Sequence, residues 1–353
     1  MTPDRPPLPD LAEFDAIIDV RSPAEFAEDH IPGAINCPVL DDAQRAEVGT
    51  LYKQVSPFEA KKIGAALVSE NIGRHLRTSF LDRPKTWKPL IYCWRGGERS
   101  GAMTTVFRSI GWRTTKLDGG YKTWRNHVVA QLATLPASFR MRVVCGATGS
   151  AKTRILQEIG RLGEQVLDLE TLASHKGSVL GILPGQPQPS QKWFETTLLQ
   201  ALAGFDPARP VYVEAESRKI GNLHVPEAVI ERIRQGDCLQ VDASLDARVA
   251  FLLNDYDYFL TLPDLLTERL DALRHLQSRE TLARWHELVR DGAWPTLVRE
   301  LLEQHYDPLY RRSQNQNFTG YQHPQVFATD DLSAAGIARL AGAIAHARTA
   351  QMA

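Results

Sequence analysis

The stretch Arg142-Val143-Val144-Cys145-Gly146-Ala147-Thr148-Gly149-Ser150-Ala151-Lys152-Thr153 decides the fold of this 353-residue chain. A short apolar run is followed by a glycine-containing turn and then by residues that can begin a helix. Such a run, bounded by a turn, predicts a buried strand. Strand, turn and helix in this order predict a parallel α/β sheet. They also place the backbone N–H groups of a loop at a helix N-terminus, where anions bind.

The loop matches the P-loop pattern Gly-x4-Gly-Lys-Thr, except that Ala151 replaces the second glycine. In a P-loop, backbone amides hold a diphosphate, the lysine neutralises it and the hydroxyl reaches a magnesium ion. We expect φ of Ala151 to be negative, because the helix starts there, and its methyl group to be tolerated. The predicted diphosphate-binding residues are Gly146, Thr148, Gly149, Ser150, Ala151, Lys152 and Thr153. The pattern indicates a diphosphate but not the group attached to it, and a glycine-rich turn without a ligand is the alternative.

The run Val211-Tyr212-Val213-Glu214 predicts a neighbouring strand that ends in a carboxylate. Glu214 or Glu216 would then lie near any metal ion or act as an active-site acid, although an ordinary carboxylate at a strand end fits equally well. We expect no tightly bound cofactor, with Mg²⁺ as a candidate ion.

Further apolar runs predict strands at 165–167, 239–241 and 325–328 around the P-loop. The leucines of 262–310 keep helical spacing, which predicts a helical insertion at about 262–312. The N-terminal part predicts a second α/β unit, with a helix from Ser100 to Ile110 whose apolar side includes Ile110. We therefore expect two domains, residues 1–135 and 140–353, joined by a linker at Leu135-Pro136-Ala137-Ser138.

A second anion-binding loop, Cys93-Trp94-Arg95-Gly96-Gly97-Glu98-Arg99-Ser100, follows the predicted strand Leu90-Ile91-Tyr92. A cysteine between a strand and a helix has its thiolate stabilised by loop N–H groups and the helix dipole. Gly96 and Gly97 allow the loop amides to point inward as an anion nest. Arg95 and Arg99 can add charge-assisted hydrogen bonds to an oxyanion. The alternative is a buried inert cysteine, which is the interpretation that we favour for Cys37, Cys145 and Cys238.

The segments Asp19-Val20-Arg21-Ser22-Pro23-Ala24-Glu25-Phe26 and His30-Ile31-Pro32-Gly33-Ala34-Ile35-Asn36 precede this loop. Together with the cysteine loop they resemble rhodanese domains, which carry sulfur as a persulfide on the loop cysteine. Five residues separate Cys93 from Arg99, which is the spacing of cysteine-dependent phosphatases. Short sulfurtransferases have one residue fewer, so a phosphatase remains an alternative at this point.

Composition and charge narrow the class of protein. No apolar run approaches the roughly 20 residues that span a bilayer, the chain start lacks a signal-peptide pattern, and the four cysteines show no metal or disulfide spacing. We therefore expect a cytoplasmic protein without a membrane partner.

The net charge of −1 hides a basic block from Arg74 to Arg142, which holds 14 Lys+Arg against 3 Asp+Glu. Such a block suggests a polyanion-binding face, or a surface neutralised by acidic neighbours.

A rhodanese-like domain followed by a P-loop domain resembles the tRNA 2-selenouridine synthase family. Stretches along nearly the whole chain carry the resemblance: Gly49-Thr50-Leu51-Tyr52-Lys53-Gln54, Asp118-Gly119-Gly120-Tyr121-Lys122, Asp168-Leu169-Glu170, His175-Lys176-Gly177-Ser178, Glu214-Ala215-Glu216-Ser217-Arg218-Lys219-Ile220-Gly221 and His305-Tyr306-Asp307-Pro308-Leu309-Tyr310-Arg311. The family's cysteine loop has the same Cys-x5-Arg length, which weakens the phosphatase alternative. Its P-loop usually has glycine where Ala151 stands.

The resemblance implies a two-step replacement of sulfur by selenium at the wobble 2-thiouridine of tRNA. Geranyl diphosphate alkylates the sulfur and releases pyrophosphate, and selenium from selenophosphate then displaces the geranylthio group. Cys93 would carry the selenium as a selenenylsulfide, with Arg95, Gly96, Gly97 and Arg99 holding the selenophosphate oxyanion. A selenophosphate-producing enzyme would be the upstream partner. Trp94 could stack on a splayed base, and candidate tRNA contacts are Arg74, Arg77, Lys122, Arg125, Arg218, Arg311 and Arg312.

Two other classes of protein stay open. One is a rhodanese-like phosphatase or sulfurtransferase regulated by a nucleotide-binding domain, which would turn over its substrates without tRNA. The other is a non-catalytic RNA- or nucleotide-binding module. The presence of Cys93, Lys152 and Thr153 argues against the second class.

Overall fold

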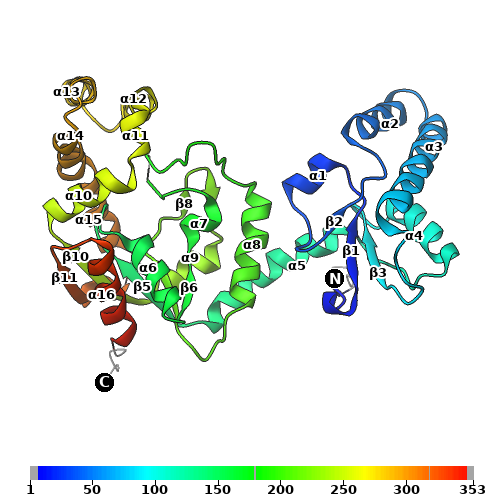
Figure 1. Ribbon diagram of the computed structural model, residues 1–353, viewed down its shortest axis with the longest axis horizontal. Coiled ribbons are helices and arrows are strands. Elements are labelled where there is room, and N and C mark those ends of the chain that lie inside the picture. Colours follow the sequence, from blue (N-terminus) through cyan, green and yellow to red (C-terminus); the bar gives the residue numbers. More distant parts are fainter. Residues whose placement is uncertain (1–6, 179, 318, 348–353) are drawn as a thin grey trace. The chain divides into compact units, whose positions relative to one another are not determined.

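Short apolar runs of the chain form the strands of two parallel sheets, one in each of two structural units (Figure 1). The computed structural model describes residues 7–178, 180–317 and 319–347. Residues 1–6 and 348–353 lie outside this part. The outer limits of the two predicted domains and the expectation of no signal peptide concern these residues. One unit is Met1–Gln131 with Ser190–Thr196, and the other is Leu132–Pro189 with Thr197–Ala353.

In the first unit, four strands among the described residues pair in the order β2-β1-β3-β4, with every pair parallel. The strands are β1 (Ala16–Asp19), β2 (Ile35–Asn36), β3 (Pro89–Tyr92) and β4 (Thr115–Lys116). The helices are η1 (Leu11–Glu13), α1 (Pro23–Glu28), α2 (Asp42–Gln54), α3 (Pro57–His75), the π-turn η2 (Leu76–Phe80), α4 (Glu98–Ile110) and α5 (Tyr121–Thr134). All four residues of β3 are buried, as expected for a central parallel strand.

A buried polar network lies beneath this sheet. The Arg21 side chain is 1% exposed and forms an ion pair with Asp19 at 2.6 Å. The same terminal nitrogen, Nη2, also donates to the Asp29 carbonyl at 2.6 Å, and Tyr121 donates to the Asp29 carboxylate. Buried charges are tolerated only when paired in this way. The rhodanese-like signature therefore supplies structural groups that fix the end of β1 and the start of α5.

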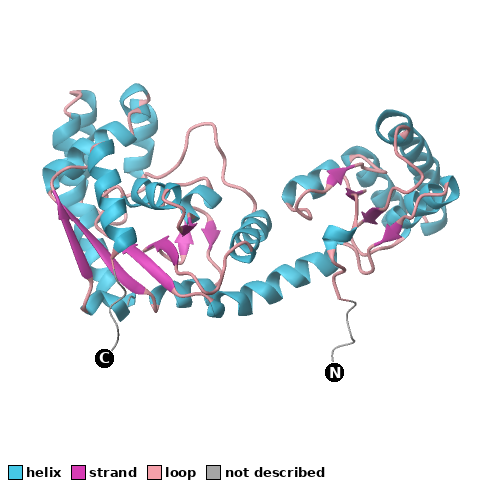
Figure 2. Cartoon of the chain, turned by 60° about the horizontal axis from the view of Figure 1, so that its bottom comes forward, coloured by secondary structure: helices cyan, strands magenta, loops and turns pink. Residues whose placement is uncertain are grey.

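In the second unit, five of the described strands form a parallel sheet in the order β11-β10-β5-β7-β6. Figure 2 shows helices beside this sheet. The strands are β5 (Met141–Cys145), β6 (Gln165–Leu167), β7 (Val211–Glu214), β10 (Asp237–Ala243) and β11 (Gln325–Thr329), and β8 (Lys219–Ile220) with β9 (Leu223–His224) makes a small hairpin. The helices of the sheet region are η3 (Leu135–Ser138), α6 (Lys152–Arg161), α7 (Leu169–Ala173), α8 (Gln191–Ala203), α9 (Glu227–Arg234), α10 (Leu245–Asp255), η5 (Thr319–Gln322) and α16 (Ala334–His346).

A helical insertion separates β10 from β11, and its helices gather into one bundle (Figure 1). It contains α11 (Tyr258–Thr261), α12 (Pro263–Asp271), α13 (Arg279–Arg290), α14 (Trp294–Leu301), the π-turn η4 (Leu302–Tyr306) and α15 (Asp307–Asn317). Leu270, Leu273 and Trp285 are fully buried in its own apolar core, which is why the stretch can form a bundle beside the sheet.

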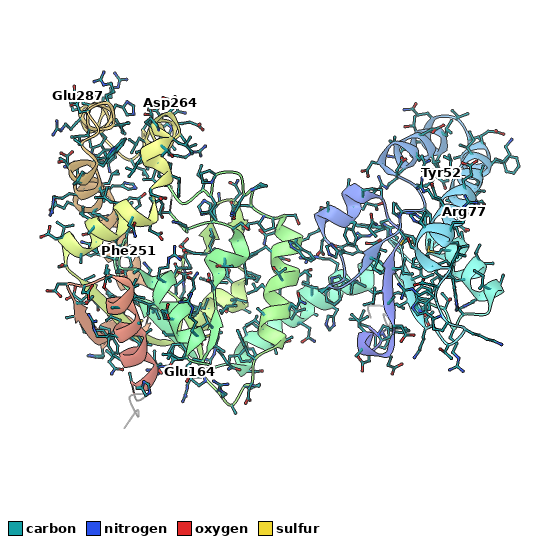
Figure 3. The ribbon with its side chains drawn as sticks, in the orientation of Figure 1. Tyr52, Arg77, Glu164, Phe251, Asp264 and Glu287 are labelled. Carbon is teal, nitrogen blue, oxygen red and sulfur yellow. The ribbon has the colours of Figure 1, made fainter. Side chains whose placement is uncertain are left out.

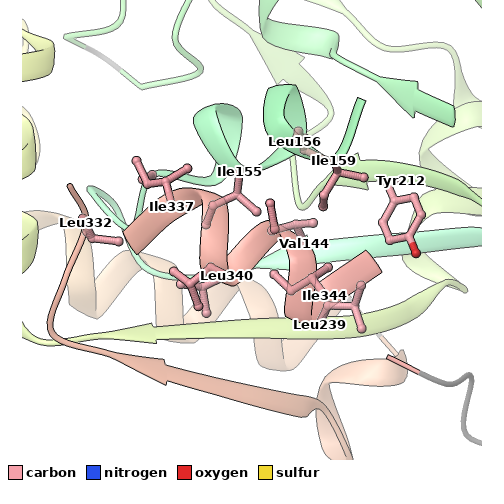
Figure 4. Packing of buried hydrophobic residues seen from close by; sticks show 13 residues of the cluster. Val144, Ile155, Leu156, Ile159, Tyr212, Leu239, Leu332, Ile337, Leu340 and Ile344 are labelled. Carbon is pink, nitrogen blue, oxygen red and sulfur yellow. The ribbon is translucent and has the colours of Figure 1, made fainter. Parts of the chain in front are cut away.

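The core of the sheet region lies between the strands and helices α6 and α16. Figure 4 shows Ile155 and Ile159 of α6 facing Ile337, Leu340 and Ile344 of α16. Ser244 caps α10 through a hydrogen bond to the Ala247 amide, and Asp168 caps α7 through the Thr171 amide. This packing fixes the N-terminus of α6 against the strand that precedes it.

The predicted fold class is confirmed: an N-terminal parallel α/β unit is followed by a P-loop sheet with a helical insertion. One detail of the sequence interpretation is wrong, because Ile110 is 50% exposed rather than part of the apolar side of α4. Residues Ser190–Thr196, which include the start of α8, group with the first unit, whereas the predicted second domain covers 140–353. The segment proposed as a linker is the short helix η3, in which Pro136 is buried.

Candidate active sites

Cys93 lies directly after β3, and the loop that follows ends at the N-terminus of α4. Its side chain is 3% exposed, and its Sγ lies 3.1 Å from the Ser100 hydroxyl. Burial alone raises the pKa of this thiol, but the Ser100 hydroxyl, the amides of Ser100 and Arg95 and the charge of Arg99 outweigh burial. The net effect is a lowered pKa, as expected for a reactive thiol. In contrast, burial raises the pKa of Cys37 to about 11.

The turn Asp118-Gly119-Gly120 supports the cysteine loop from below. Tyr121 donates its backbone N–H to the Cys93 carbonyl at 2.8 Å, and Lys122 donates to the Trp94 carbonyl at 3.1 Å. Gly120 has φ of +59°, and a Cβ there would lie 2.2 Å from the Cys93 carbonyl oxygen. Only glycine allows the backbone of the two loops to approach this closely. The turn is therefore a part of the thiol site that the sequence interpretation did not assign.

Residues around Cys93 line an open bowl of about 380 Å³: Trp94, Arg95, Gly97, Glu98 and Arg99. Arg95 is exposed at its rim. Arg99, which was predicted to bind an oxyanion, forms an ion pair with Glu25 at 2.7 Å. Glu25 also pairs with Arg45 at 2.9 Å. An anion in the bowl therefore competes with Glu25 for the Arg99 guanidinium.

The P-loop joins β5 to α6, with Lys152 as the first residue of the helix. Gly146 and Gly149 have φ of +157° and +84°. The expectation for Ala151 is wrong: its φ is +58°, in the left-handed region, and the residue is the N-cap of α6 rather than part of its first turn. Left-handed backbone costs a residue with a Cβ roughly 1–2 kcal/mol. The buried Ala151 methyl group packs in the core beside Ile155, which offsets part of that cost.

Helix α15 and helix α10 hold the P-loop from its other side. The Tyr310 hydroxyl accepts a 2.6 Å hydrogen bond from the Gly146 amide. Arg248 donates to the Thr148 carbonyl at 3.2 Å and forms a two-pronged ion pair with Asp307 at 2.7 and 2.9 Å. Lys152 donates to the Gly146 carbonyl at 3.0 Å, so its ammonium group lies at the loop.

Three carboxylates gather beside Thr153. Its hydroxyl donates to Glu170 at 2.7 Å and to Glu214 at 3.1 Å, and side-chain oxygens of Glu170, Glu214 and Glu216 lie within 4.8 Å of one another. Burial, followed by the charges of the neighbouring carboxylates, raises the pKa of Glu214 well above its usual value, and the pKa of Glu216 is also raised. Gly177 lies against the group, since a Cβ there would be 2.7 Å from a Glu170 oxygen. The predicted pair Glu214 and Glu216 is thus joined by Glu170.

The P-loop and the carboxylates line one cavity of about 530 Å³. Other groups in its wall come from α10, from the helical insertion and from the segment after α7. They include His175, Lys176, Phe251, Asp255, His305, Tyr306 and Tyr310. Lys176 forms an ion pair with Asp255 at 2.6 Å and lies 4.1 Å from the centre of the Tyr256 ring. The cavity is large enough for a diphosphate with a further group attached.

Comparison with known proteins assigns both halves of the chain. Residues 139–261 match the model described as the tRNA 2-selenouridine synthase AAA domain, and residues 8–127 match the rhodanese-like domain. The tRNA 2-selenouridine synthase of Alcanivorax borkumensis is 32% identical over 326 residues, which cover 83% of this chain and 88% of that relative. The chain belongs to the tRNA 2-selenouridine synthase family. This confirms the resemblance drawn from its motifs.

The family's enzyme from Nitrosomonas europaea is 36% identical over 254 residues, 70% of this chain and 64% of that relative. The match therefore spans just under two thirds of this relative's length. The enzyme from Marinobacter nauticus is 30% identical over 333 residues, 83% of this chain and 87% of the relative. None of the described helices is long and apolar enough to cross a bilayer.

The candidate tRNA contacts of this family member differ in their availability. Arg74, Arg77, Lys122, Arg311 and Arg312 are exposed, and Figure 3 labels Arg77 on the first unit. Arg125 and Arg218 are already engaged by Glu195 and Glu227. Trp94 stacks on Tyr121 with ring centres 5.3 Å apart, so it is part of the wall of the cysteine bowl.

Sequence reasoning assigned no role to several residues that the structure brings to the sites, among them Gly120 and Arg248. Glu170, Tyr310 and Asp307 belong to motifs that were noticed only as family matches. Their roles depend on tertiary contacts, since each lies far from the P-loop in sequence. Glu25 was likewise recognised only within the rhodanese-like signature, and the distance of 74 residues to Arg99 carries no local signal.

Proposed function

We propose that this chain replaces sulfur by selenium at the wobble 2-thiouridine of tRNA, in two steps that use two separate sites. The observation that carries the proposal is the coexistence, in one member of this family, of a thiol with a lowered pKa and a P-loop cavity lined by carboxylates. A sulfurtransferase needs only the first site, and a nucleotide-binding module needs only the second.

The first step is transfer of the geranyl group from geranyl diphosphate to the thiocarbonyl sulfur. The carbon–oxygen bond to the diphosphate breaks, the carbon–sulfur bond forms and pyrophosphate leaves. The P-loop amides and Lys152 hold the diphosphate and stabilise the charge that develops on the leaving group. Tyr310 and the Lys152 ammonium, which now bond Gly146, exchange these contacts for phosphate oxygens.

A magnesium ion fits the residues present beside the P-loop. One Glu214 oxygen is fully buried and has no hydrogen-bond partner among the described residues, and the Thr153 hydroxyl donates to the other oxygen of this carboxylate. Oxygen donors of this kind are those that Mg²⁺ prefers. Thr153 with Glu170, Glu214 or Glu216 would hold the ion, which would supply additional neutralisation of the diphosphate.

The second step introduces selenium through Cys93. The loop amides, Arg95 and Arg99 bind the selenophosphate oxyanion in the cysteine bowl, next to the Cys93 thiolate. The phosphorus–selenium bond breaks and water takes the phosphoryl group as phosphate, while selenium bonds to C2 of the base and the carbon–sulfur bond breaks, so that geranylthiol leaves. Alkylation comes first because geranylation converts the sulfur into a better leaving group. The lowered pKa supports this role, since it keeps Cys93 largely as thiolate closer to neutral pH than an ordinary cysteine.

The tRNA partner is supported by the basic block of Arg74 to Arg142. Exposed Arg74, Arg77 and Lys122 can neutralise phosphates, and Arg311 and Arg312 can do so on the second unit. The base that reacts must be splayed out of the anticodon stack. Selenophosphate would be delivered by the enzyme that produces it.

The proposal is tested by incubating the purified chain with 2-thiouridine-containing tRNA, geranyl diphosphate and selenophosphate, followed by mass spectrometry of the nucleosides. Expected are S-geranyl-2-thiouridine when selenophosphate is omitted, and 2-selenouridine in the complete mixture. Unchanged 2-thiouridine in every reaction, together with tRNA-independent turnover of phosphate esters or of thiosulfate with cyanide, would favour the phosphatase or sulfurtransferase.

A further inference from the structure

A second cavity, of about 70 Å³, lies within the helical insertion. Its wall is almost wholly apolar and comes from α10, α11, α12, α14 and η4. The residues found only in this cavity are Leu180, Leu253, Phe259, Leu260, Leu266, Trp294, Leu297, Val298, Leu301 and Leu302. Leu297 is 1% exposed and Leu302 is fully buried, so the wall belongs to the core of the bundle.

This apolar cavity adjoins the P-loop cavity. Five residues line both: Thr148, Ser178, Leu252, Tyr256 and Tyr306. Thr148 is itself a P-loop residue, and Leu252 packs against the loop, since a Cβ on Gly149 would lie 2.8 Å from it. A single ligand can therefore place an anionic end on the P-loop and an apolar end among the insertion helices.

The lining excludes a nucleobase as the group in the apolar cavity. Among the described residues of its lining, polar side-chain atoms occur only at the junction with the P-loop cavity, apart from the Trp294 indole. A base edge buried there would leave donors and acceptors without partners, which is costly. A branched hydrocarbon chain has no such groups and gains from every carbon that leaves water.

We propose that the apolar cavity binds the distal isoprene unit of a prenyl diphosphate whose diphosphate lies on the P-loop, and that its volume limits the chain length accepted. The inference rests on the proposed function and adds to it the residues that select the substrate. A cavity of 70 Å³ holds about five to seven water-sized groups. That matches one isoprene unit and leaves no room for a further one, so farnesyl diphosphate is too long.

The test is binding of the full-length chain to inorganic pyrophosphate and to dimethylallyl, geranyl and farnesyl diphosphates by titration calorimetry, without tRNA. Geranyl diphosphate is expected to bind at least about tenfold more tightly than dimethylallyl diphosphate, since it alone fills the apolar cavity. Farnesyl diphosphate is expected to bind more weakly than geranyl diphosphate. Equal affinities for all three prenyl diphosphates would overturn the proposal.

Two substitutions locate the effect. Val298→Phe fills the cavity and should weaken geranyl diphosphate binding about tenfold or more, with pyrophosphate affinity unchanged as a check on the P-loop. Leu266→Ala enlarges the cavity and should shift the preference toward farnesyl diphosphate. Val326→Phe introduces the same side chain at a 54% exposed position of β11 and should change neither. Unaltered geranyl diphosphate affinity in Val298→Phe would contradict the assignment.

Failure of the proposed function gives a different pattern. Chain-length-dependent binding without any change of tRNA would refute the synthase activity and support the cavity assignment. Modification of tRNA, together with equal binding of the three prenyl diphosphates, would support the synthase activity and refute the cavity assignment.

Discussion

We expect the substitution Gly120→Ala to lower the reactivity of Cys93, although it leaves the cysteine side chain itself unchanged. Gly120 has φ of +59°, and the added Cβ would lie 2.2 Å from the Cys93 carbonyl oxygen and 2.6 Å from the Gly96 nitrogen. Nonbonded heavy atoms pack at about 3.5–4.0 Å, so the cysteine loop must withdraw by about 1 Å. Backbone strain and overpacking together should lower the free energy of unfolding by about 2–5 kcal/mol.

The assay is the rate of Cys93 alkylation by iodoacetamide at neutral pH, followed by peptide mass spectrometry. We expect at least about a tenfold fall, because displaced loop amides no longer stabilise the thiolate. Gly33→Ala is the matched control, since Gly33 also has a left-handed φ of +78° but open space around its Cβ position. Gly33→Ala should therefore lower the free energy of unfolding through backbone strain alone and leave the alkylation rate of Cys93 unchanged. Equal alkylation rates in the two variants would refute the supporting role of the turn.

Three other changes test the same sites. Alkylation of Cys93 should show a midpoint below that of an ordinary cysteine, because its pKa is lowered, and Ser100→Ala should raise that midpoint. A hydrogen bond to a charged group contributes about 1.5–3 kcal/mol, so its loss lowers the fraction of thiolate at neutral pH. Because the less acidic thiolate is more nucleophilic, the alkylation rate should fall only about three- to tenfold. An unchanged pH profile of alkylation would contradict the Ser100 assignment. Glu25→Gln should free Arg99 and tighten binding of an oxyanion such as sulfate about two- to fivefold, measured by titration, and weaker binding would show that Glu25 positions Arg99 instead. Ala151→Gly should leave stability within about 1 kcal/mol, because relief of the left-handed strain is offset by the lost methyl burial and a more flexible unfolded chain. In contrast, Ala151→Val should impair pyrophosphate binding, and full affinity there would argue against the strained backbone.

The sequence predicted those features that depend on local pattern. The strand before each loop, the glycine turn and the following helix are neighbours in the chain, so the strands at 165–167, 211–214 and 325–328 were expected with nearly their observed bounds. Both loops between a strand and a helix N-terminus were predicted for the same reason, because such turns have a strict residue order, and their anion binding stays a prediction.

Features set by tertiary contacts were missed or wrong. The φ of Ala151 was assigned by assuming an ideal helix start, whereas the loop places this residue in the left-handed region. The Arg99–Glu25 ion pair and the Thr153–Glu170 hydrogen bond join elements distant in sequence. The apolar cavity is closed by α10, α11, α12, α14 and η4 together, so leucine spacing predicted helices without indicating the space between them.

The assignment of one reaction step to each of the two sites is tested most directly by assaying each variant separately with the substrates of each step. With 2-thiouridine tRNA and geranyl diphosphate, Cys93→Ala should form the S-geranyl base and Lys152→Ala should not. With S-geranylated tRNA and selenophosphate, the result should reverse, so that Lys152→Ala yields 2-selenouridine and Cys93→Ala yields none. Loss of both steps in either correctly folded variant would contradict the account, because the two loops would then serve one common reaction.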